Sequence, residues 1–189
     1  MGPVLETIFK SRHFYDEANR GAVIKSPVQL IVQAVRSLRT PPPDLGVLIE
    51  SMNLMGQNLF QPPSVKGWEG GRSWINTSTL FVRQNVLVYL LTGRLPAGYT
   101  ALSTRTKFDG LKLLEPLRAS ANKSKEQLTT DKATEHLVKL CMPPVSQEPD
   151  EVQLATLQQF AETQGPEISN ELVIGLLCLI TAMPEYQLC

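Results

Sequence analysis

The chain has 189 residues, of which 42% are hydrophobic and 19% charged, a composition that suits one folded domain and argues against wholesale disorder. Eighteen basic and eighteen acidic side chains cancel, so the chain lacks the basic surface expected of a nucleic-acid-binding protein. The longest apolar stretch, residues 172–183, is too short to span a bilayer. We therefore expect neither a nucleic-acid partner nor a transmembrane segment.

The first third of the chain carries clear helix signals. A short helix is expected over residues 3–11, with Leu5, Ile8 and Phe9 facing inward. Ser26 and Pro27 are a typical N-cap and first helical residue, and they start an amphipathic helix that ends before three consecutive prolines.

A third helix follows, which Asp44 caps and which stops at Gly56. The helix expected over residues 77–92 is apolar almost all round, so we predict that it is the central buried element. Gly93 terminates it.

The remainder is less regular at first and then helical again. Between Arg94 and Asn122 the pattern weakens, which predicts a linker with at most one short helix. Three further helices are expected near residues 124–142, 149–164 and 168–183. The fold class predicted is all-α, an irregular bundle of six or seven helices with one long ordered loop. The parts are a helical core over 1–93, a linker over 94–123 and a C-terminal three-helix part over 124–189, together one domain.

The most unusual segment runs from Phe60 to Arg83 and reads FQPPSVKGWEGGRSWINTSTLFVR. Its prolines fix the backbone and its glycines permit angles closed to other residues, so it is a shaped loop that leads into a helix. Both tryptophans of the chain lie here, and they either anchor the loop on the core or form an aromatic platform for a ligand. The candidate binding residues are Gln61, Trp68, Glu69, Arg72, Trp74, Asn76, Thr77 and Arg83.

Arg83 lies about two turns into the most apolar helix, where an unpaired cation would be costly. We expect it to be buried and paired, with Glu69 or Asp44 as the carboxylate within reach, or with several backbone carbonyls. The alternative is that Arg83 binds an anion, with Lys25 lining the same cleft.

Catalytic and metal-binding signatures are weak. The cysteines Cys141, Cys178 and Cys189 lack metal-ligand spacing, and we predict no metal and no cofactor. Two of them lie in apolar runs and are expected as buried thiols, with a disulfide to Cys189 left open. The loop holds no histidine or cysteine and only one carboxylate, Glu69, so a catalytic role is disfavoured although no catalytic residue can be named.

The run LMGQNLFQPPSVKGWEGGRSWINTSTLFVRQN resembles the hallmark of a large bacterial family, the "domain of unknown function eighteen-hundred" family. IKSPVQLIVQAVRSL and the closing PEYQL resemble other segments of that family. The resemblance implies a C-terminal portion of a longer exported protein, located in the periplasm, in the cell envelope or outside the cell. It also implies a secreted sulfatase-like protein as partner.

These observations favour a non-catalytic interaction or assembly module, with the loop over residues 61–76 as its recognition surface. The alternative is a glycan- or anion-binding domain, or part of a hydrolase, with a cleft lined by Trp68, Trp74, Asn76 and Arg83. The wide apolar arcs of the helices over 27–38 and 77–92 also predict an exposed apolar surface, or a homodimer that covers it.

Overall fold

A computed structural model describes residues 1–39, 41, 44–94, 108–124, 127–142 and 151–189. Over these residues the prediction of an all-α fold is confirmed, and the only bridge between extended residues there joins Ile24 to Leu188. The α-helices are α1 (Gly2–Lys10), α2 (Pro27–Ser37), α3 (Leu45–Leu54), α4 (Thr77–Thr92), α5 (Glu115–Ser124), α6 (Thr130–Cys141), α7 (Glu151–Thr163) and α8 (Asn170–Ala182). Short 3₁₀ helices are η1 (Arg12–Tyr15), η2 (Glu17–Asn19), η3 (Gly71–Trp74), η4 (Gly110–Leu114) and η5 (Pro184–Gln187).

Local capping explains where the helices near the loop begin and end. The Ser26 hydroxyl accepts a hydrogen bond from the Gln29 backbone N–H, and the Gln29 side chain accepts one from the Ser26 N–H, a reciprocal capping box. The Asp44 carboxylate accepts from the N–H of Gly46 at the start of α3. Gly93 ends α4 in the left-handed region at a φ of 70°.

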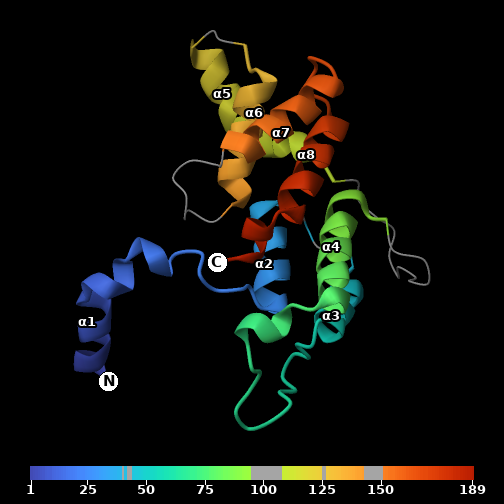
Figure 1. The fold of residues 1–189 in the computed structure, drawn as a ribbon. Coiled ribbons are helices and arrows are strands. Elements are labelled where there is room, and N and C mark those ends of the chain that lie inside the picture. Colours follow the sequence, from blue (N-terminus) through green and yellow to red (C-terminus); the bar gives the residue numbers. More distant parts are fainter. Residues whose placement is uncertain (40, 42–43, 95–107, 125–126, 143–150) are drawn as a thin grey trace.

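The helices form two groups whose main helix–helix contact is between α4 and α8 (Figure 1). In the first group α4 packs against α2 and α3, and in the second α6 packs against α7 and α8. Helix α8 also packs against α4, and one continuous cluster of buried apolar side chains runs through both groups. Burial of this shared cluster is the main stabilising contribution to the fold.

Two elements differ from the expected pattern in the second half. Residues 110–124, expected as part of a linker, form η4 and α5, while residues 95–107 lie outside the described part of the chain. The helix expected from residue 124 begins at Thr130, because the Thr129 hydroxyl caps it by accepting from the Lys132 N–H.

One prediction about burial is wrong, and a second, that α4 is the central buried element, holds except near the start of the helix. Leu5, Ile8 and Phe9 were expected to face inward, but they are 49%, 45% and 50% exposed because α1 stands apart from the body (Figure 1). Helix α4 is buried at Val86, Leu87 and along its C-terminal half, yet Leu80 and Phe81 near its start are 44% and 67% exposed. Apolar periodicity alone does not tell which side of a helix lacks a neighbour.

Candidate functional site

The segment between α3 and α4, residues 56–74, is an anchored loop whose two ends meet at one side chain. Trp74 is only 7% exposed. A Cβ atom built on Gly56 would lie 4.0 Å from its ring, and one on Gly70 would lie 3.9 Å from its Nε1. Both glycines have positive φ, 89° and 77°, which other residues rarely adopt. The indole therefore packs against the first and the last part of the loop.

Hydrogen bonds tie the ends of the anchored loop to the helices. The Thr79 hydroxyl donates to the carbonyl of Trp74 at 2.9 Å, and the Asn76 side chain accepts from the Thr79 N–H at 2.9 Å. At the other end, the Gln57 side chain accepts from the N–H of Val28 at 2.9 Å. The loop is thus joined to the N-termini of both α2 and α4.

The loop tip, residues 58–67, extends away from the body (Figure 1). Two of its apolar side chains, Phe60 and Val65, are 95% and 106% exposed, whereas Leu59 packs against the core. Phe60 also has a φ of 62°, a conformation that is costly for a bulky residue. The backbone turns through bonds within the tip, such as Gln61 N–H to the Asn58 carbonyl at 3.2 Å and Gly67 N–H to the Ser64 carbonyl at 3.0 Å.

Behind the loop lies a second feature, the cation cluster of Lys25, Arg83, Tyr186 and Gln187. Lys25, Arg83 and Tyr186 are each 0% exposed. The Arg83 guanidinium donates to the Lys25 carbonyl at 2.6 Å and to the Gln187 side-chain oxygen at 3.1 Å. The Lys25 ammonium donates to the Tyr186 carbonyl and lies 4.3 Å from the centre of the Tyr186 ring, a cation–π contact.

The cluster holds two buried cations without a carboxylate bonded to either of them among the described residues. Burial lowers the pKa of Lys25 to about 8 and that of Arg83 to about 10, because each charge has lost contact with water. Burial also raises the pKa of the nearby Cys141 thiol to about 12. The charges are stabilised by carbonyl dipoles and an aromatic face instead of an ion pair.

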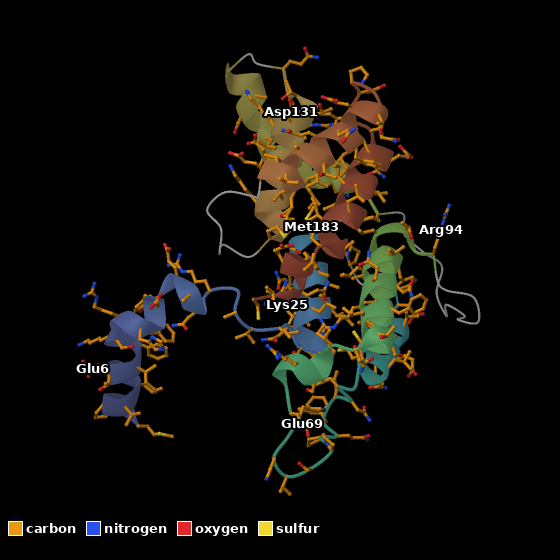
Figure 2. All side chains as sticks on the ribbon, in the orientation of Figure 1. Glu6, Lys25, Glu69, Arg94, Asp131 and Met183 are labelled. Atoms are coloured by element: carbon orange, nitrogen blue, oxygen red, sulfur yellow. The ribbon has the colours of Figure 1, made fainter. Side chains whose placement is uncertain are left out.

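The carboxylate partners expected for Arg83 are incorrect, whereas the alternative of backbone carbonyls agrees with its bond to the Lys25 carbonyl. Glu69 is exposed in the loop, far from Lys25 in the view of Figure 2, and Asp44 caps α3. Arg83 instead bonds to groups that are 58 and 104 residues away in sequence. The expectation that Arg83 is buried agrees with its exposure of 0%.

The structure separates the other candidate residues into two environments. Trp74, Arg83 and Lys25 are buried, so they do not form the wall of an open cleft. Trp68 is half-buried, and the remaining candidates are exposed, namely Gln61, Glu69, Arg72, Asn76 and Thr77. Asn76 caps α4 with its side chain.

Sequence reasoning missed Phe60 and Val65 as site residues, and it missed Tyr186 and Gln187 in the cluster. An exposed aromatic residue has the same sequence signal as a buried one, so only a positive φ or a neighbouring Pro-Pro pair could have drawn attention to Phe60. Tyr186 and Gln187 lie near the end of the chain, where no local signal links them to Lys25.

Metal-ligand clusters and membrane-spanning helices are absent from the part of the chain that the structure describes. No group of three or more histidine, cysteine, aspartate or glutamate side chains there is arranged to hold a metal ion. None of the helices described combines the length and apolar character required to cross a bilayer. All three cysteines are free thiols, Cys141 buried and Cys189 exposed.

Fold and site together define an all-α protein that presents an anchored, protruding loop and holds its charged cluster out of contact with solvent. Comparison with family models agrees with the sequence resemblance, since the model "Protein of unknown function (DUF1800)" matches residues 1–188. The chain belongs to the DUF1800 family. No curated protein and no solved structure gives a significant match to it.

Proposed function

We propose that this chain is a protein-interaction module and that its loop tip is the surface that binds the partner. The observation that carries the proposal is the nearly complete exposure of Phe60 and Val65 on a loop anchored by buried Trp74. Aromatic side chains often supply much of the binding energy of an interface when they enter a pocket on the partner.

The construction of the loop supports a binding role. Anchoring by Trp74 and by the bonds to Gln57 and Thr79 fixes the loop before a partner arrives, which reduces the conformational entropy lost on binding. Phe60 contributes little to its own protein, because its ring has almost no intramolecular contact and its backbone is strained. A costly, exposed aromatic residue is easiest to explain if another molecule covers it.

The proposal extends to the setting suggested by the sequence resemblance. We infer an exported bacterial protein that works in the periplasm, the cell envelope or outside the cell, with a secreted sulfatase-like protein as the partner. The competing role, a glycan- or anion-binding or hydrolytic cleft built from Trp68, Trp74, Asn76 and Arg83, needs access to side chains that are buried at two of its four positions. We therefore favour the interaction module.

The test measures binding of the purified chain to the sulfatase-like protein by calorimetry. Phe60→Gly removes the ring and also relieves the positive φ, so it should weaken binding at least about tenfold without lowering stability. Phe81→Ser is the matched control, because Phe81 is also an exposed aromatic side chain but lies on α4. Equal affinity of the Phe60→Gly variant and the native chain would refute a role of the loop tip.

A further inference from the structure

The N-terminal arm, residues 1–19, presents an apolar face that is about half exposed. No residue of α1 is buried, and its main contact with another element is with η1. The exposed apolar side chains Val4, Leu5, Ile8 and Phe9 share one face of the helix, while Glu6 and Lys10 lie on the opposite face. Figure 1 shows the arm standing clear of the body.

The arm has a defined internal structure, so its apolar face is a formed surface. The rings of Phe9 and Phe14 meet edge to face with 5.1 Å between their centres. Phe14 and Tyr15 meet in the same way at 5.2 Å. These contacts fold η1 back onto the end of α1 and widen the apolar face by two aromatic rings.

A groove on the body has matching character. It runs along the outer side of α2, has a volume of about 580 Å³ and is lined by Val28, Gln29, Val32, Gln33, Arg36, Ser37 and Cys189. Val32, in its middle, is 44% exposed. At about 1.5 Å per residue, α1 and the stretch of α2 from Val28 to Arg36 have nearly the same length, about 13 Å.

The arm leaves the body at the edge of this groove. Val23 and Cys189 exchange two backbone hydrogen bonds, of 2.9 and 3.3 Å, and Cys189 itself lines the groove. The chain is therefore fixed from Val23 onward, and only residues 20–22, with Gly21 at a φ of 59°, connect this point to the arm. Beyond these three residues the arm points away from the body (Figure 1), so this short linker would have to change for the arm to enter its own groove.

We propose that the arm of each chain docks in the α2 groove of a second copy, giving a twofold-symmetric dimer with exchanged arms. Each copy carries one exposed apolar face and one apolar groove. In a twofold-symmetric dimer the contact between arm and groove therefore forms twice, and both faces and both grooves are covered. A short linker that points the arm away from its own chain favours docking on a second copy over docking on the same chain. Arg36 is the one charged side chain among the residues that line the groove, which suits the apolar face of α1.

The first experiment measures the mass of the native chain by light scattering and its dimer dissociation constant by sedimentation. Ile8→Glu in the arm and Val32→Glu in the groove change exposed side chains, so both variants should fold. Each should weaken the dimer at least about tenfold, since a charge would enter an apolar contact. Val152→Glu, at a 71% exposed position on α7, is the matched control and should leave the dimer unchanged.

Mixing the two variants distinguishes exchange from any other dimer. The Ile8→Glu chain keeps the native groove, and the Val32→Glu chain keeps the native arm. A heterodimer of the two therefore contains one native contact between arm and groove, whereas either homodimer contains none, so the heterodimer should be tighter. A monomer at all concentrations, or a dimer that both variants leave intact, would overturn the proposal.

Cross-linking identifies which copy receives the arm. An Ile8→Cys variant should form a disulfide with the native Cys189 of another chain and give a covalent dimer, which the added change Cys189→Ser abolishes. A disulfide within one chain, seen as a monomer on a non-reducing gel, would mean that the arm returns to its own groove and would also overturn the proposal.

Discussion

The loop tip and the cation cluster depart in opposite directions from the usual placement of side chains in a folded protein. In the tip, Phe60 and Val65 are apolar and almost fully exposed, whereas in the cluster Lys25 and Arg83 are charged and fully buried. The buried cations bond to backbone and side-chain oxygens from distant parts of the chain. The exposed apolar side chains have no such contacts.

This difference separates residues that hold the protein together from residues available to another molecule. Removing a member of the cluster leaves buried polar groups without partners, which costs free energy of unfolding. Removing a side chain of the tip leaves nothing unpaired. Variants of the two regions therefore test this comparison, together with variants of Trp74, which lies between the loop and the core. They follow in order of decreasing expected change in the free energy of unfolding.

Trp74→Ala should have the largest effect and lower the free energy of unfolding by about 3–5 kcal/mol, because it empties the space between the loop ends and the core. Urea denaturation measures this change, and Trp68→Ala, at a half-buried position, is the control with a smaller loss. If Trp74→Ala cost no more than Trp68→Ala, Trp74 would not be the anchor of the loop.

Arg83→Met should lower the free energy of unfolding by about 1–3 kcal/mol, because it leaves the Lys25 carbonyl and the Gln187 side chain unpaired. The loss is limited because methionine fills a similar volume without a buried charge. Thermal and urea denaturation give the value, with exposed Arg72→Met as a control expected near zero. Loss of partner binding at an unchanged melting temperature would instead assign Arg83 to the binding surface.

From the lowered pKa of Lys25 we predict that the stability of the protein depends on pH. Its pKa is about 8 in the folded chain and 10.5 when unperturbed, so between these values the unfolded chain binds more protons and stability rises with pH. From pH 7 to pH 9 the gain should be about 1 kcal/mol. Above pH 9 the raised pKa of Cys141 acts in the opposite sense.

Urea denaturation at pH 7, 8 and 9 measures this gain. Lys25→Met should remove it, whereas Lys66→Met, on the exposed loop tip, should retain it. The same slope in both variants would assign the titration to another group.

Phe60→Gly should have the smallest effect on stability and, unlike the Trp74 and Arg83 variants, should not lower it. Glycine adopts a φ of 62° without strain, so the free energy of unfolding should stay constant or rise by up to about 1 kcal/mol. A clear loss of stability, measured beside the Phe81→Ser control, would show that the exposed ring supports the fold after all.

Local features were predictable from the sequence, and long-range ones were not. The predicted caps at Ser26 and Asp44 depend on residues within three positions, and both form hydrogen bonds of the expected kind. The burial of Arg83 follows from its apolar neighbours. Its partners do not, because the cluster joins residues up to 161 positions apart.

Exposure of the arm and the loop tip was equally out of reach. Leu5, Ile8 and Phe60 have the composition of core residues, and whether a neighbouring element covers them depends on the whole arrangement of the chain. The weak pattern over 110–124 concealed α5, whose sequence has few apolar residues to mark its period.

The bridge between Ile24 and Leu188 also bears on the order in which the chain can acquire its native contacts. Lys25 and Arg83 bond to groups in η5 that are far from them in sequence, so both cations stay hydrated until this contact closes. Closing this contact brings together segments more than 160 positions apart, the kind of non-local step that slows folding. The core is therefore complete only when this long-range contact has formed and η5 has replaced water around the two cations.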